Sequence, residues 1–68
     1  MTDRLEELAD VARLRTEVDV IERDRIAAAR AAGASWERIA STLGVRSRQG
    51  AEQRYNRLVE STALPATE

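Results

Sequence analysis

The chain begins with an uninterrupted helix-compatible segment in which apolar residues recur every three or four positions. Residues 2–32 contain neither glycine nor proline, so nothing in this segment is expected to stop a helix. Its first large apolar residues are Leu5, Leu8, Val11, Leu14, Val18 and Ile21. The last four of these are spaced like a heptad repeat. The pattern predicts a long first helix, which Ile26, Ala29 and Ala32 continue up to Gly33.

The length of this first segment leaves two interpretations open. One continuous or gently kinked helix over residues 3–32, capped by Thr2 or Asp3, would be about 45 Å long at about 1.5 Å per residue. Alternatively, the pair Thr16 and Asp19 could restart a helix, so that residues 3–15 would form a separate short one. We favour the continuous helix. A domain of 68 residues cannot bury it along its whole length, so we expect its first half to pack on a second copy.

Two shorter helical patterns follow, separated by a short break. Ser35 is a candidate N-cap for the first pattern, and Gly44 stands where a helix commonly ends in a left-handed residue. Ser47 is a candidate N-cap for a helix over about residues 47–59, and residues 61–68, with Pro65, are expected to be a disordered tail. We expect Trp36 to fill the centre of a three-helix core. The predicted core residues are Ile26, Trp36, Ile39, Ala40, Leu43, Ala51, Tyr55 and Leu58.

The composition supports an all-α domain and argues against an enzyme. Ala, Leu, Val and Ile supply most apolar residues, and the chain contains no Phe and a single Pro. Without His, Cys or Lys, it lacks the usual bases, nucleophiles and metal ligands, and we expect no catalytic residue, metal or cofactor. No apolar run is long enough to cross a membrane and no signal peptide is recognisable, which predicts a cytoplasmic or nucleoid location.

The charge distribution is more informative than the net charge of −1. Residues 1–24 hold eight acids and four arginines, a local charge of −4, whereas residues 25–68 hold seven arginines and four acids, a local charge of +3. Within residues 46–57, four arginines stand against Glu52 alone. Phosphate binding depends on such a local patch, so the third helix is a candidate for contact with nucleic acid.

The segment from Trp36 to Leu58 resembles the second half of a Myb/SANT repeat. The shared positions are Trp36-x-x-Ile39-Ala40-x-x-Leu43-x-x-Arg46-Ser47 and, further on, Arg54-Tyr55-x-x-Leu58. Bacterial homeodomain-like regulators are similar through Gly33-Ala34-Ser35-Trp36 and Ile39-Ala40-x-x-Leu43-Gly44-Val45. The resemblance covers about a third of the chain. It implies an all-α, tri-helical, homeodomain-like helix-turn-helix, here with a long N-terminal helix extension.

The resemblance and the helical spacing together define candidate DNA contacts. Base-reading positions, by similarity, are Gln49, Glu52, Gln53 and Asn56, and the helical spacing adds Arg48 on the same outward face. The predicted phosphate contacts are Arg46, Ser47, Arg54 and Arg57, with Arg38 and Arg30 as weaker candidates. The chain has one repeat, although Myb proteins often use several, so two chains acting together are expected.

Several of these residues have a structural alternative. Arg54 could pair with Glu22 on the first helix, and Arg46 could cap the carbonyls of the preceding helix. The two glutamines could be ordinary solvated residues. Gly50 could keep a side chain away from DNA or from a neighbouring helix, or could simply be tolerated. The charged residues of the first helix are expected to form mainly a solvated face: Arg13, Arg15, Glu17, Asp19, Glu22 and Arg23.

The predicted organisation is a helical extension over residues 1–18, a DNA-binding domain over 19–60 and the tail. We expect double-stranded DNA binding by a homodimeric bacterial transcriptional regulator or nucleoid-associated protein. The predicted dimer interface is Leu5, Leu8, Val11, Leu14, Val18 and Ile21. The alternative is a protein-interaction adaptor or antitoxin-like module whose acidic first helix binds a different protein. The DNA site and the direction of the two helices in a dimer stay open.

Overall fold

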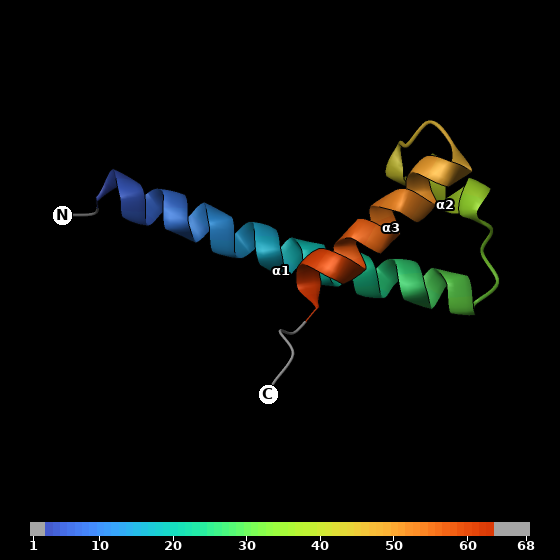
Figure 1. Ribbon diagram of the computed structural model, residues 1–68, viewed down its shortest axis with the longest axis horizontal. Coiled ribbons are helices and arrows are strands. Elements are labelled where there is room, and N and C mark those ends of the chain that lie inside the picture. The colour runs from blue at the N-terminus through green and yellow to red at the C-terminus, as the bar shows by residue number, and fades with distance from the viewer. Residues whose placement is uncertain (1–2, 64–68) are drawn as a thin grey trace.

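The computed structural model describes residues 3–63, which form three helices and no strand (Figure 1). Helix α1 spans Arg4–Ala31, α2 spans Trp36–Leu43 and α3 spans Arg48–Thr62. The prediction of an all-α chain is confirmed. Helices α2 and α3 both lie over the second half of α1, whose first half projects away from them (Figure 1).

Helix α1 is one continuous helix of 28 residues. The Asp3 carboxylate caps it by accepting a hydrogen bond from the Leu5 amide at 3.3 Å. At the alternative break point the Thr16 hydroxyl donates to the carbonyl of Ala12 at 3.1 Å, an arrangement that leaves the helix intact. The helix ends at Ala31, and Gly33, just beyond the C-cap Ala32, adopts a φ of 96° that is strained for other residues. The continuous interpretation therefore describes this segment.

Local capping chemistry fixes the ends of the two shorter helices. The Ser35 hydroxyl accepts from the amide of Arg38 at 3.2 Å, and the Ser47 hydroxyl accepts from the amide of Gly50 at 3.0 Å. Gly44 is left-handed, with a φ of 75°, and the next amide, that of Val45, bonds to a carbonyl of the last turn of α2. Both predicted N-caps and the predicted glycine stop are confirmed.

The hydrophobic core is small. Its buried residues are Ile26 from α1, Ile39 and Ala40 from α2, and Ala51 and Leu58 from α3. The expectation that Trp36 fills the centre was wrong. Its ring is only partly buried and packs against Tyr55 with ring centroids 5.8 Å apart, at the edge of the core. Leu43 is also partly buried against the core, as are Ala29, Ala34 and Val45, which were not among the predicted core residues.

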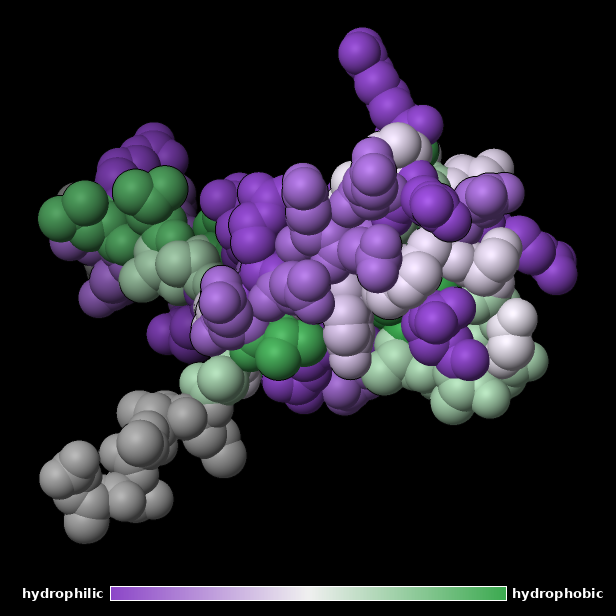
Figure 2. All heavy atoms as spheres, turned by 45° about the vertical axis from the view of Figure 1, so that its right-hand side comes forward, coloured by the Kyte–Doolittle hydropathy of each residue, from purple (hydrophilic) through white to green (hydrophobic). Residues whose placement is uncertain are grey.

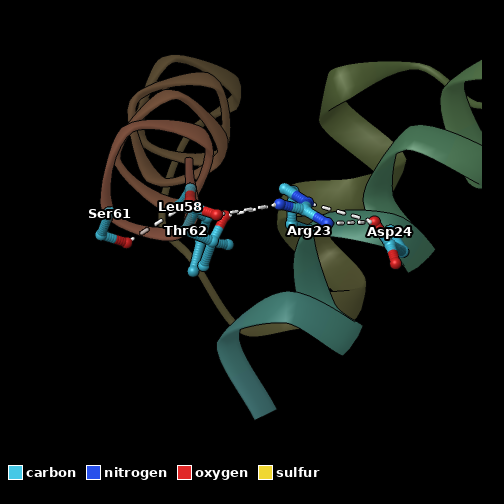
Figure 3. A network of polar contacts seen from close by, with 5 residues as sticks. All are labelled: Arg23, Asp24, Leu58, Ser61 and Thr62. Atoms are coloured by element: carbon cyan, nitrogen blue, oxygen red, sulfur yellow. Dashed lines mark hydrogen bonds and ion pairs between the residues drawn. The ribbon is translucent and has the colours of Figure 1, made fainter. Parts of the chain in front are cut away.

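The end of α3 lies beyond the predicted position near residue 59, because a residue of α1 supports it. The Arg23 guanidinium donates to the Thr62 hydroxyl at 2.8 Å, and its other edge contacts the carboxylate of Asp24 (Figure 3). A cation at a helix C-terminus is favourable because the last carbonyls lack partners within the helix. The predicted tail therefore begins too early, and its residues 64–68 lie outside the described part.

The first half of α1 carries large apolar side chains on its surface. Figure 2 shows apolar atoms gathered at the projecting end of this helix. The exposed residues, with their exposed fractions, are Leu5 71%, Leu8 65%, Val11 48%, Leu14 59%, Val18 57% and Ile21 54%. Over residues 3–63, no helix combines the length and apolar character that a membrane crossing requires. Their exposure makes these six side chains an unpartnered surface within residues 3–63.

Candidate nucleic-acid interface

The outward face of α3 carries polar side chains with both donors and acceptors. Ala51 and Leu58 turn the opposite face toward the core, which leaves the intervening positions in solvent. The five predicted base-reading residues are all exposed: Arg48, Gln49, Glu52, Gln53 and Asn56. Within residues 3–63 none of these side chains forms a hydrogen bond or an ion pair. Their hydrogen-bonding capacity is therefore available to a ligand.

Arginines surround this face. Arg46 lies in the turn before α3 and Arg57 lies about two and a half turns along the helix, and both side chains are exposed. Neither makes a side-chain hydrogen bond within the described chain, so Arg46 does not cap the carbonyls of α2. Ser47 uses its hydroxyl oxygen as the N-cap of α3, which places this residue beside the helix N-terminal amides. These groups together suit contact with an anion.

Arg54 has a structural partner. Its Nε donates to one carboxylate oxygen of Glu22 at 2.6 Å and its Nη2 donates to the other at 3.0 Å. This planar, bidentate pair joins α3 to α1. The pKa of Arg54 is raised because Glu22 accepts these hydrogen bonds and because Glu22 and Asp19 are negatively charged, whereas burial opposes the shift. The alternative interpretation of Arg54 therefore holds, and we withdraw it as a phosphate contact.

The two weaker phosphate candidates have different environments. The Arg30 guanidinium stacks 4.9 Å from the centroid of the Trp36 ring and donates to the carbonyl of Ala34 at 3.0 Å. It therefore fastens the connection between α1 and α2. Arg38 is exposed, and its side chain has no partner within residues 3–63. It lies on the rim of a groove between α1 and α2, away from the outward face of α3.

Gly50 is required by the turn that precedes α3. A Cβ atom added at this position would lie 2.7 Å from Cγ1 of Val45, closer than real contacts allow. Val45 is a stiff β-branched residue packed against the core, so it cannot move aside cheaply. The close approach is thus to the turn of this chain, which replaces the proposed approach of DNA as the reason for a glycine.

Two charged residues of α1 depart from the solvated face on which they were mainly expected. Glu22 and Arg23 are partly buried and bond to side chains of α3, and for Glu22 this is the pairing with Arg54 that was the stated alternative. Their signal is weak in the sequence, because only the packing of α3 brings the partners together. A usable hint is that they stand next to Ile26 in the helical pattern, where a polar residue borders the core.

The chemistry available at this surface is recognition through hydrogen bonds and positive charge. Within residues 3–63, no three acidic, His or Cys side chains are arranged to hold a metal ion. Comparison of the chain with protein-family models, with curated proteins and with solved structures found no match in any of the three. The functional interpretation therefore depends on the residues and their geometry.

Proposed function

We propose that α2, the turn at residues 44–47 and α3 form a homeodomain-like helix-turn-helix that binds double-stranded DNA. The observation that carries this proposal is the outward face of α3, where five exposed polar side chains form no hydrogen bond or ion pair within residues 3–63. Arg48 can bond guanine bidentately, and Gln49 or Gln53 can bond adenine in the same way. Arg46 and Arg57 are placed to contact the phosphates on either side.

In this proposal the protein acts as a dimer and serves as a small transcriptional regulator or nucleoid-associated protein. One short recognition helix offers a small interface, and a second copy doubles it. The Myb-like resemblance of Trp36 to Leu58 points in the same direction. The exposed apolar residues of α1 also fit the second candidate function, a module that binds a different protein. That candidate predicts weak DNA affinity at physiological salt.

The proposal is tested by titrating labelled duplex fragments of random sequence with the protein at two salt concentrations. We expect binding that falls steeply as salt rises, because arginines displace counterions from the phosphates. Arg48→Ala should weaken binding about tenfold or more, and Arg57→Ala should reduce the slope of log affinity against log salt by about 1. The matched control is Arg13→Ala, which removes an exposed arginine from α1 and should leave DNA binding unchanged.

Circular dichroism of each variant separates loss of binding from loss of fold. No binding of the unaltered protein at low salt, or equal effects of Arg48→Ala and Arg13→Ala, would exclude α3 as the recognition helix. In that case the polar face of α3 is a solvated surface, and a protein partner of α1 becomes the better hypothesis.

A further inference from the structure

A stripe of apolar side chains on α1 is exposed to solvent along the first part of the helix, and the same side of the helix lines a groove further along. At about 100° per residue, Val11, Leu14, Val18 and Ile21 point within about 80° of one another. Arg25 continues the same line. Beyond it, α1 and α2 diverge and leave a groove of about 480 Å³, whose walls include Ile26 and Ala29 from α1 and Leu43 from α2. The unpartnered stripe and the open groove are therefore one continuous surface.

We propose that a second copy of this chain covers this surface, with the two α1 helices antiparallel. The first half of each α1 then lies along the stripe of its partner and reaches the partner's groove between α1 and α2. This inference specifies the dimer of the proposed function, but its evidence comes from α1 and the groove and does not depend on DNA binding.

The apolar pattern sets the register of the pair. Antiparallel packing brings Leu14 opposite Val18 of the partner and Val11 opposite Ile21 of the partner, so that the numbers of facing residues add up to about 32. The same register places Glu7 opposite Arg25 of the partner. Within one chain these two residues are about 27 Å apart along the helix, so they cannot pair with each other. The dimer would contain this ion pair twice.

The charges on the stripe select the direction of the partner. In a parallel pair Glu7 would face Glu7 of the partner and Arg25 would face Arg25 of the partner. Like charges would then be buried together at the seam, the line of contact between the two α1 helices. The residues that flank the seam favour the parallel direction. A parallel pair would bring Asp10 near Arg15 of the partner, whereas an antiparallel pair brings Arg15 near Arg15 of the partner. In the pair the flanking residues would stay in solvent at its edges, where salt screens them more strongly than groups between the two helices. The seam therefore decides the direction.

Leu5 and Leu8 leave the line of the stripe. Eighteen residues make about five turns, so Leu8 points in the same direction as Ile26, the flank on which α3 packs. The two-fold axis of an antiparallel pair is normal to the plane of the two helices, so this flank faces the same side in both copies. Leu8 then lies level with residue 24 of the partner at the edge of the pair, whereas Leu5 points about 160° from the stripe, away from the partner helix. They are the most exposed apolar side chains, at 71% and 65%.

The same symmetry places both α3 helices on one side of the dimer. The axis passes near residue 16, so the two Ile26 residues are about 30 Å apart along the helices. Successive major grooves on one face of DNA are about 34 Å apart. A parallel pair would instead place both α3 helices at the same end. The antiparallel dimer is thus compatible with two recognition helices contacting one face of a duplex.

Cysteine cross-linking tests the direction directly, because the natural chain has no cysteine. Arg4→Cys and Ala28→Cys leave the proposed ion pair intact and should face each other across the antiparallel seam. We expect a disulfide when the two variants are mixed under oxidation, and none from either alone, since identical positions are about 36 Å apart. Disulfides formed by each variant alone would show a parallel pair and overturn the proposal.

Charge exchange tests the ion pair, with the mass in solution measured by sedimentation without DNA. Glu7→Arg and Arg25→Glu should each weaken self-association about tenfold or more, because they bring like charges together at the seam. The double variant should restore it, and so should an equimolar mixture of the two single variants, which would form heterodimers. Helix content by circular dichroism checks that each chain is folded.

Other outcomes decide against the proposal. Unchanged association of both single variants, or a double variant as weak as either, would exclude the facing of Glu7 and Arg25. An unaltered chain that stays monomeric at about millimolar concentration would overturn the dimer and assign the stripe to a different protein. Because none of these measurements contains DNA, their failure leaves the test of DNA binding independent.

Discussion

The two halves of α1 are both helical and free of glycine and proline, but their surroundings are very different. Among the described residues, the first half makes ion pairs only with itself, between Arg4 and Glu7 and between Asp10 and Arg13. The second half sends Glu22 and Arg23 to α3 and buries Ile26, which is 4% exposed. Helix formation is thus the same in both halves, whereas only the second has tertiary partners. The difference shows that local sequence makes the helix and that packing decides which half belongs to the domain.

The largest expected difference between the two halves of α1 is the loss in the free energy of unfolding when an apolar side chain is shortened. Ile26→Ala should lower the free energy of unfolding by about 3 kcal/mol, because it leaves a cavity in a small core. Leu14→Ala, in the first half, should change it by less than about 0.5 kcal/mol in dilute solution, because Leu14 is solvent exposed. Chemical denaturation followed by circular dichroism measures both.

Repeating these measurements at several protein concentrations tests the first prediction further. If the first half of α1 packs on a second copy, the cost of Leu14→Ala should grow as concentration rises, while that of Ile26→Ala is already large in dilute solution. A large cost of Leu14→Ala in dilute solution would contradict the exposed position of this residue.

A smaller difference is expected between a tertiary ion pair and a local one. Glu22→Gln should lower the free energy of unfolding by about 1 kcal/mol, because the bidentate pair with Arg54 joins two helices. Asp10→Asn should lower it by at most about 0.3 kcal/mol, because its partner lies three residues along the same exposed helix. Thermal unfolding of matched samples compares the two isosteric changes. Equal costs would mean that the α1–α3 pair adds nothing beyond a surface pair.

The smallest effect concerns the end of α3. Arg23→Met keeps the aliphatic part of the side chain but removes the donors to Thr62, so the last turn of α3 should fray. We expect about a tenfold loss of amide protection in this turn and a cost of about 0.5 kcal/mol in global stability. Arg15→Met is the control, and hydrogen exchange measured by NMR is the readout. Unchanged protection at Ser61 and Thr62 would show that α3 ends here without help from α1.

The features that sequence predicted well depend on neighbouring residues. Ser35 and Ser47 cap helices because a hydroxyl reaches an amide three residues further on, and Gly44 ends a helix because it tolerates a left-handed backbone. The exposure of the polar face of α3 follows in the same way from the spacing of Ala51 and Leu58. These are local facts, so one sequence is enough to find them.

The features that sequence missed depend on how helices cross. The last turn of α3 needs Arg23, which is 39 residues away. The role of Arg54 was open because both a phosphate and Glu22 fit a guanidinium, and only the crossing of α1 and α3 brings the carboxylate within reach. Trp36 looked central because it is the largest apolar residue, but the core has room only for smaller side chains. DNA binding and the dimer remain predictions.

Because α1 is one uninterrupted helix, its length sets the distance between the groups at its two ends. In the proposed dimer, every residue inserted between the seam and the domain would move each DNA-binding unit by about 1.5 Å and rotate it by about 100°. Distance and phase are therefore coupled, and insertions of about 7, 11 or 18 residues would preserve the facing of both units. Two related proteins with the same recognition helix could thus select operators of different spacing through a whole number of helical repeats, with no change in the residues that read the bases.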